Sequence, residues 1–294
     1  MTATQAELDA LRKRLKPPGP VIDVHVHPLP LRVSGREATP REAAEDLLAH
    51  ADRAGVTRLV LMNLGRVWST TPDPAAFRAA NDDCLRIRDI APDRFLSFCY
   101  VNPMHTEASL AELDRCIGRE GMVGVKLWVA VRANDPRVRL IAEKAVALDV
   151  PILQHTWNKA EGNGPGESSP DDLAALARAV PHARLILGHL GGGGLRGIEA
   201  VVDLPQVVVE TAGSDPESGI VEAAVRRLGT RRVIFGSDAR GRHFATQLAK
   251  VTGANLSVAA QRRILWDNLA RLLPAKAGVR PLGDTGPLPE DRPQ

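Results

Sequence analysis

The 294-residue chain has few cysteines and no long apolar segment. Its three cysteines, Cys84, Cys99 and Cys116, are odd in number and form no metal-type pair, which argues against a disulfide framework. The longest apolar runs have the length of a strand, so none could span a membrane. No charged and then apolar leader precedes a small-residue cleavage site. We therefore expect a cytoplasmic protein with reduced thiols.

A large excess of charge of one sign is also missing. The 38 basic and 35 acidic residues leave a formal net charge of +3. Such an even mixture does not indicate a surface for nucleic acid or lipid. We expect a small-molecule substrate as the partner, with no nucleic acid and no membrane, and the sequence leaves a homo-oligomer open.

The chain carries no glycine-rich dinucleotide fingerprint after its first strand. It shows instead a regular alternation of apolar strands and helices. Several strands are apolar at nearly every position, which is typical of parallel strands buried on both faces. The eight expected strands are Val21–His25, Arg58–Asn63, Phe95–Val101, Val123–Leu127, Pro151–His155, Arg184–His189, Val207–Glu210 and Val233–Gly236.

The helical segments between these strands share one start signal, a capping side chain followed by proline. The pairs are Thr39-Pro40, Asp73-Pro74, Asp135-Pro136, Ser169-Pro170 and Asp215-Pro216. Glu42 completes a capping box with Thr39, and Gly55 is placed to end the same helix.

This alternation predicts an α/β protein that consists of one (β/α)₈ TIM barrel over residues 21–273. An open doubly wound sheet has the same alternation and is the alternative at this point. Residues 1–20 are expected to form an N-terminal helical extension. Residues 274–294, rich in proline, glycine and charge, are expected to form a flexible C-terminal tail.

Polar residues recur at the C-terminal ends of the expected strands, where such barrels carry their catalytic groups. They are His25, His27, Lys126, His155, His189 and Asp238. His25 and His27 stand two apart in a strand, so their side chains are expected on one side. Because imidazole and carboxylate groups suit a divalent ion, this rim predicts a metal site.

The same residues, with the segments DVHVHP, GVKLW, LILGHLGG, VVVETAG, IFGSD and ILWDNLARLL, resemble the amidohydrolase superfamily. Within it they are similar to the amidohydrolase-related group, which includes aminocarboxymuconate-semialdehyde decarboxylase-like lyases. The resemblance runs from about Val21 to Leu273. It implies metal ligands at His25, His27 and His155, and a ligand or base at Asp238.

The resemblance also implies that His189 is an acid/base group beside the metal or a ligand to a second metal. Lys126 matches a lysine that bridges two metals as a carbamate in some branches. We expect an unmodified Lys126 and one divalent ion, zinc in the first place and manganese as the alternative. Trp128 and Trp157 are candidates for an apolar wall around the substrate, and Arg66 and Arg240 for binding a substrate carboxylate.

The first expectation for the reaction is hydrolysis of a small cyclic or acyl substrate, an ester, amide or lactone, by a metal-activated water. The alternative is non-oxidative decarboxylation of an unsaturated or aromatic acid at the same site. A third hypothesis is a metal-binding barrel without catalysis, because Trp128 and Arg240 depart from the common pattern. A metal-dependent deoxyribonuclease is disfavoured, since Lys126 stands where those enzymes usually have glutamate.

Overall fold

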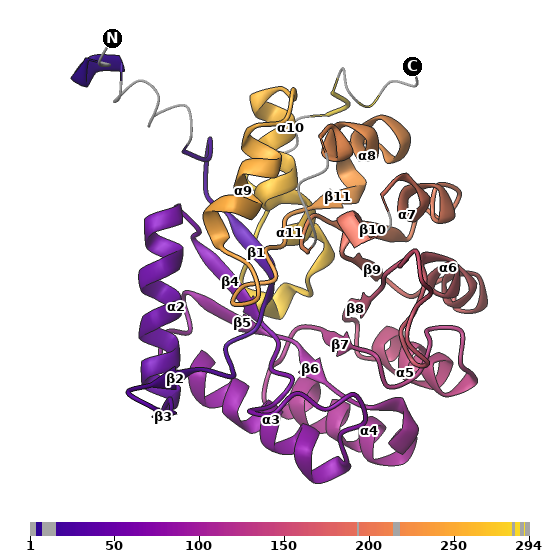
Figure 1. Ribbon diagram of the computed structural model, residues 1–294. Helices are drawn as coiled ribbons and strands as arrows, with labels where there is room; N and C mark the ends of the chain where they lie inside the picture. Colours follow the sequence, from indigo (N-terminus) through magenta and orange to yellow (C-terminus); the bar gives the residue numbers. More distant parts are fainter. Residues whose placement is uncertain are drawn as a thin grey trace.

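The computed structural model describes residues 4–7, 16–192, 194–213, 218–283, 286–288 and 291. Across these residues the strands form a ring with helices on its outside (Figure 1). The strands of the ring are β1 (Ile22–Val26), β4 (Arg58–Leu61), β5 (Phe95–Ser97), β6 (Cys99–Tyr100), β7 (Val125–Leu127), β8 (Ile152–His155), β9 (Leu185–Gly188), β10 (Val207–Glu210) and β11 (Val233–Ile234). All eight expected strands are present, and β5 and β6 are two halves of one of them, interrupted at Phe98.

Two parallel sheets make up the ring, in the orders β1-β4-β5 and β6-β7-β8-β9-β10-β11. They are joined on one side where Phe98 N donates to Leu61 O at 2.9 Å. On the other side Val24 N donates to Phe235 O at 3.1 Å, and Asp238 N donates to His25 O at 2.8 Å. These bonds connect β11 to β1, so the TIM barrel is confirmed and the open doubly wound sheet is not formed.

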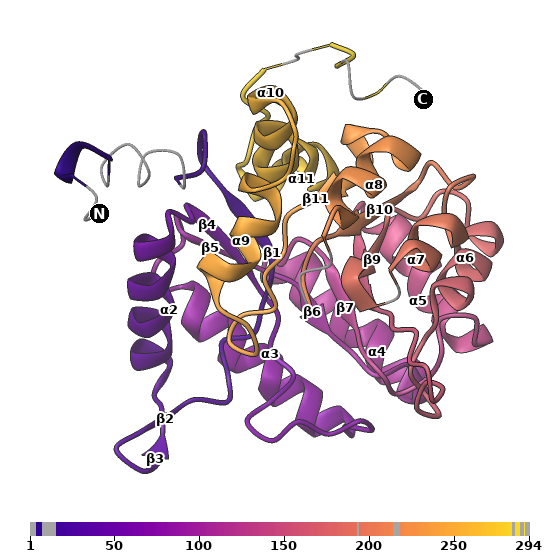
Figure 2. The ribbon, with the colours of Figure 1, turned by 45° about the horizontal axis from the view of Figure 1, so that its top comes forward.

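Helices cover the outer face of the strands, and the tilted view of Figure 2 shows α2 and α3 on one side and α5, α6 and α7 on the other. Their bounds are α2 (Pro40–Ala54), α3 (Pro74–Arg88), α4 (Thr106–Leu113), α5 (Pro136–Ala147), α6 (Pro170–Ala179), α7 (Leu195–Ala200), α8 (Ile220–Leu228), α9 (Phe244–Thr252), α10 (Val258–Arg262) and α11 (Asn268–Leu272). A short hairpin, β2 (Arg32–Val33) and β3 (Arg36–Glu37), was not expected. No described helix is long and apolar enough to cross a bilayer.

The predicted helix starts are confirmed wherever the structure describes them. The side chains of Thr39, Asp73, Asp135 and Ser169 each accept a hydrogen bond from a backbone N–H in the first turn. Thr39 forms the expected capping box, and Gly55 ends α2 with a φ of 81°. The pair Asp215-Pro216 lies outside the described residues.

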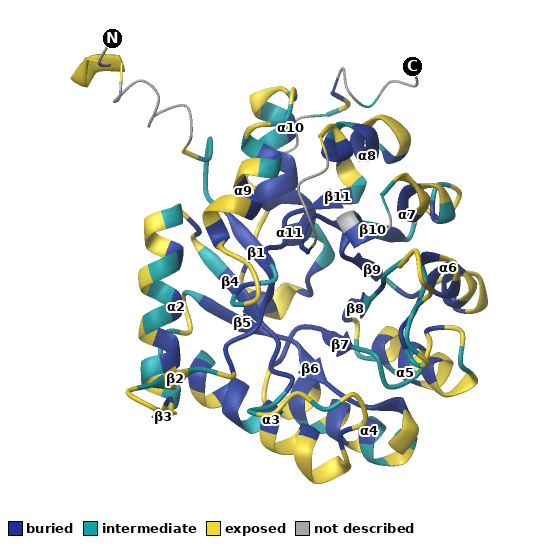
Figure 3. Cartoon of the chain, in the orientation of Figure 1, coloured by how far each residue is buried: buried dark blue, intermediate teal, exposed yellow. Residues whose placement is uncertain are grey.

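Two apolar layers stabilise the barrel. One lies between the strands and the helices, and the other fills the interior of the ring. The inner layer joins Ile22 and Val24 of β1 to Trp266, Leu269 and Leu273 near the C-terminus. Figure 3 shows the strands buried and the helices exposed on their outer faces. The interior is thus a packed core, which leaves the rim at the strand ends for chemistry.

The predicted extensions are described only in part. Residues 4–7 and 16–20 are the described part of the N-terminal extension. In the C-terminal segment, Val279 and Leu288 are buried, and Asp291 forms an ion pair with Arg263 at 2.9 Å. These residues are packed against the barrel, because apolar side chains and a buried arginine hold them there. The flexibility of the C-terminal segment as a whole stays a prediction.

Candidate metal centre at the barrel rim

The ends of β1 and β11 bring two imidazoles and a carboxylate together. The Nε2 atoms of His25 and His27 lie 3.1 Å apart. Asp238 Oδ1 lies 3.3 Å from His27 Nε2 and 3.7 Å from His25 Nε2. Both histidines are buried, and the Asp238 side chain is only 17% exposed. Three of the four side chains that were expected to hold the metal therefore converge on one place.

A bulge in β1 contributes to this convergence. Asp23 pairs with Leu59 of β4, but Val26 pairs with Leu61, so β1 has one residue more than β4 in this stretch. Val24 faces the inner core, and strict alternation would place His25 on the opposite face. The extra residue changes the alternation, so His25 turns into the mouth of the barrel.

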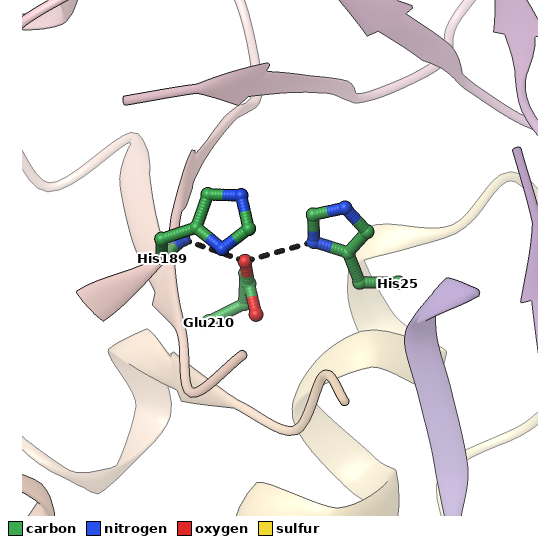
Figure 4. A group of neighbouring side chains, drawn as sticks. All are labelled: His25, His189 and Glu210. Carbon is green, nitrogen blue, oxygen red and sulfur yellow. Dashed lines mark hydrogen bonds and ion pairs between the residues drawn. The ribbon is translucent and has the colours of Figure 1, made fainter. Parts of the chain in front are cut away.

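Hydrogen bonds on the far side of the His25 and His27 rings determine which ring nitrogen carries the proton and which one faces Asp238. His27 Nδ1 lies 2.8 Å from Met62 O, which can only accept, so Nδ1 carries the proton. His25 Nδ1 lies 3.1 Å from Glu210 Oε1, which also accepts from the His189 backbone N–H at 2.7 Å (Figure 4). Both Nε2 atoms therefore present lone pairs to each other.

Two facing lone pairs beside a carboxylate oxygen repel one another unless a cation lies among them. This donor set fits a divalent metal ion, because zinc and related ions are bound by neutral imidazoles and carboxylates. Each imidazole also donates its other N–H to an acceptor, the arrangement that orients metal-binding histidines. The residues present thus fit the metal implied by the sequence.

Lys126 of β7 points into the same space, with Nζ 3.0 Å from His25 Nε2. Burial lowers the pKa of Lys126 to about 8, although Asp238 and Glu210 act in the opposite direction. Burial also lowers the pKa of His25 and of His189 well below the ordinary value. These histidines are therefore neutral at physiological pH, which is the form that binds metals.

Asp238 stays ionised in this environment. Burial acts to raise its pKa, but the imidazoles of His27, His25 and His189 that surround the carboxylate outweigh burial and lower it overall. Its backbone lies in the left-handed region with φ 60°, and that of His189 does so with φ 66°. Residues other than glycine rarely adopt this conformation, and such residues cluster at functional sites.

Two glycines leave room for the site. A Cβ at Gly213, whose φ is +84°, would lie 2.3 Å from His189 Nδ1. A Cβ at Gly236 would lie 2.4 Å from Glu210 Oε2 and 3.2 Å from His25 Cβ. The distances of 2.3 and 2.4 Å are shorter than a real Cβ contact, so the close packing of these side chains requires glycine at both positions.

His189 and His155 lie beside the converging group. The ring of His189 is 4.9 Å from that of His25 and 4.8 Å from that of His155, centroid to centroid. His189 Nδ1 is buried and has no hydrogen-bond partner among the described residues. His155 Nε2 bonds to Glu167 Oε1 at 3.1 Å. His189, whose Nδ1 is free to exchange a proton, thus lies next to the candidate metal site.

A cavity of about 570 Å³ opens next to His155, and Trp128, Lys159 and Glu167 are among its lining residues. Trp68, which the sequence did not single out, lies 5.8 Å from the Trp128 ring and 5.2 Å from the His27 ring. The Trp157 ring stacks on His155 at 6.0 Å. Aromatic side chains, Trp128 and Trp157 among them, therefore flank the site.

Arg66 and Arg240 are not brought into this group. Arg66 Nε donates to Asp83 at 2.8 Å, and its NH1 pairs with Glu37 at 3.0 Å. Arg240 pairs with Asp46 and donates from Nε to the Pro28 carbonyl at 3.0 Å. Acceptors of the protein itself engage both guanidinium groups, so the predicted role in binding a substrate carboxylate has no support from this geometry.

Sequence reasoning assigned no role to Glu210, Trp68 and Glu167. Glu210 had a usable signal, because it ends the seventh expected strand on the same rim as the histidines. Trp68 and Glu167 lie in connections outside the regular elements. No periodic pattern places a side chain from such a segment, so the sequence offered no comparable signal for them.

Fold and site define a (β/α)₈ barrel with a candidate metal centre at the C-terminal ends of its strands. The amidohydrolase family model matches residues 22–275, and the chain belongs to this family of enzymes. The resemblance seen in the sequence is thereby confirmed. No curated protein matches the chain.

Solved structures of similar fold cover most of the chain. 2,6-Dihydroxybenzoate decarboxylase from Rhizobium has a TM-score of 0.67 at 18% identity, over 86% of this chain and 98% of that chain. A putative amidohydrolase from Staphylococcus aureus has a TM-score of 0.69 at 16% identity, over 87% and 99%. A dihydroxybenzoic acid decarboxylase from Polaromonas sp. JS666, with bound manganese and 2-nitroresorcinol, has a TM-score of 0.64 at 20% identity, over 86% and 96%. At such identities the likeness shows the fold.

Proposed function

We propose that this protein is a metal-dependent, non-oxidative decarboxylase of a small planar acid, aromatic or unsaturated. The carrying observation is the convergence of His25 Nε2, His27 Nε2 and Asp238 Oδ1 within 3.1 to 3.7 Å of one another. The aromatic side chains that flank the site suit a planar substrate. The decarboxylases among the solved neighbours favour this alternative over the hydrolase expected first.

One divalent ion is proposed, held by His25, His27, Asp238 and His155, with Lys126 unmodified. Such an ion supplies Lewis-acid polarisation and orients the oxygen atoms of the acid. Zinc and manganese both suit this set of nitrogen and oxygen ligands, and a manganese-containing neighbour makes manganese the first ion to test.

The remaining chemistry falls to the residues of the chain. In decarboxylation the bond between the carboxyl group and its carbon breaks, its electrons stay on the carbon, a proton joins the carbon and carbon dioxide leaves. Asp238, which is ionised, takes a proton from the substrate hydroxyl or water and returns it to the carbon. His189, which is neutral, donates a hydrogen bond that polarises the substrate.

The test is a product assay on protein loaded with manganese or zinc. Hydroxybenzoates and unsaturated diacids form one panel, and lactones, esters and amides form a second. Carbon dioxide in equal amount to a decarboxylated product, abolished by His25→Asn, supports the proposal. A ring-opened or hydrolysed acid without carbon dioxide establishes the hydrolase instead. Turnover of neither panel by metal-loaded protein favours the metal-binding barrel without catalysis.

A further inference from the structure

We propose that Glu167 is a positioning residue that fixes the tautomer of His155 and leaves His155 Nδ1 as its metal-binding atom. The proposal rests on the proposed function in so far as His155 serves as a ligand. It concerns a carboxylate outside the rim of the barrel, in the connection between β8 and α6.

Three donors surround the Glu167 carboxylate. Oε1 accepts from His155 Nε2 at 3.1 Å, and Oε2 accepts from Lys159 Nζ at 2.8 Å and from the Gly164 backbone N–H at 3.0 Å. The Glu167 side chain is only 9% exposed. With three donors around it, the group is an ionised carboxylate, which accepts hydrogen bonds and donates none.

The acceptor beside His155 Nε2 determines which nitrogen of this imidazole carries the proton. The neutral imidazole, which is the form that binds a metal ion, carries one proton. That proton lies on Nε2, because Glu167 Oε1 can only accept it. The single lone pair of the ring is then on Nδ1. Any metal bound by this imidazole must be bound through that atom.

For His25 of β1 and for His27, which directly follows β1, the partner lies at the opposite ring nitrogen. Their Nδ1 atoms donate to Glu210 and to the Met62 carbonyl, and their Nε2 atoms face the centre. The structure thus predicts mixed ligation, by Nε2 from His25 and His27 and by Nδ1 from His155. Carboxylate partners of this kind commonly change metal affinity by 10–100-fold when they are removed.

The backbone around Glu167 is itself held in place. Trp157 N donates to Ser168 O at 2.9 Å, and Thr156 and Ser168 form a parallel bridge. Gly166 packs so closely that a Cβ would lie 2.0 Å from Val129 O. The carboxylate is therefore presented to His155 by a fixed segment of chain.

The experiment compares Glu167→Ala and Glu167→Gln with Glu161→Gln, a matched control at an exposed glutamate of the same connection. Nitrogen-15 NMR of the imidazoles in metal-free protein identifies the tautomer of His155, whose signals are assigned by their loss in His155→Asn. Calorimetric titration with Mn²⁺ gives the metal affinity. We expect the Nε2–H tautomer in the unsubstituted protein and a mixture of tautomers in Glu167→Ala. We also expect about 10–100-fold weaker binding of Mn²⁺ in that variant and no change in Glu161→Gln.

The tautomer of the unsubstituted protein is decisive even where Glu167→Ala fails to fold. An Nδ1–H tautomer of His155 in the unsubstituted protein overturns the proposal. So does an unchanged His155 tautomer together with an unchanged Mn²⁺ affinity in folded Glu167→Gln and Glu167→Ala. The two proposals can fail separately. If the His155 tautomer and the Mn²⁺ affinity depend on Glu167 but the protein decarboxylates no acid, this inference is supported and the proposed function fails.

Discussion

Two buried polar clusters at opposite ends of the barrel are built in opposite ways. The base cluster consists of Arg263, Thr230, Asn268 and Asp291, and the rim cluster of His25, His27, Lys126, Glu210 and Asp238. In the base cluster, fully buried Arg263 donates from NH1 to Thr230 Oγ1 at 2.8 Å and to Asp291 Oδ2 at 2.9 Å. Asn268 Nδ2 donates to the carbonyls of Thr230 and Val233, each at 2.7 Å.

The difference lies in how donors meet acceptors. In the base cluster these donors meet acceptors and a positive charge meets a negative one, so the arrangement serves stability. In the rim cluster two imidazole lone pairs and a carboxylate oxygen face one another. Lys126 Nζ lies 3.0 Å from one of these acceptors, His25 Nε2. An excess of acceptors in one place is suited to a cation that the protein binds. The base should therefore govern unfolding, and the rim should govern metal binding and turnover.

Removing a rim ligand gives the largest effect. His25→Asn replaces the imidazole that contacts His27, Lys126 and Glu210, so the bound metal should fall below about a tenth of an equivalent and turnover should be lost. Elemental analysis after purification with added metal measures this. The midpoint of urea unfolding of the metal-free protein should change little, and a large drop would show that the rim also serves stability.

His189→Asn should separate catalysis from metal binding. His189 lies beside the converging atoms, so the variant should keep its metal and lose about 10²–10⁴-fold in kcat. Metal content and steady-state kinetics on the same preparation test this. Loss of metal as severe as in His25→Asn would make His189 a ligand, and nearly full activity would leave it a structural residue.

Arg263→Ala should affect the other end of the barrel. It leaves Asp291 and Thr230 without their buried partner, so we expect about 3–5 kcal/mol lower free energy of unfolding. Urea denaturation of the metal-free protein provides the value, with Arg262→Ala as the control, since Arg262 is exposed and adjacent. The metal stoichiometry of folded Arg263→Ala should be unchanged, and a loss of metal would contradict the separation of the two clusters.

The smallest effect is expected for the reactivity of the three cysteine thiols, which belong to neither the base cluster nor the rim cluster. Cys84, Cys99 and Cys116 are buried and unpaired. Burial raises the pKa of Cys84 to about 12, so only about 10⁻⁴ of it is thiolate at pH 8. Because all three thiols are buried, a thiol reagent should react with none of them in native protein at pH 8 and with all of them in denaturant. Rapid reaction in native protein would indicate that the barrel opens locally.

The sequence predicted what depends on local pattern. Eight strands, four described helix caps and the rim positions of His25, His155 and Asp238 follow from periodicity, capping and strand ends. The bulge in β1 could not be predicted, because it depends on the register of β4 as a neighbour. The acidic partners of Arg66 and Arg240 lie far away in sequence, so two arginines that resembled substrate-binding groups are engaged elsewhere. The packing of Asp291 on Arg263 likewise depends on tertiary contact.

The most direct test of the account is a crystal structure of manganese-loaded protein with anomalous-scattering data. We expect one anomalous peak in the barrel, within bonding distance of Nε2 of His25 and His27, Asp238 Oδ1 and Nδ1 of His155. A peak away from these atoms, a second peak bridged by a carbamate on Lys126, or no peak after loading would contradict it.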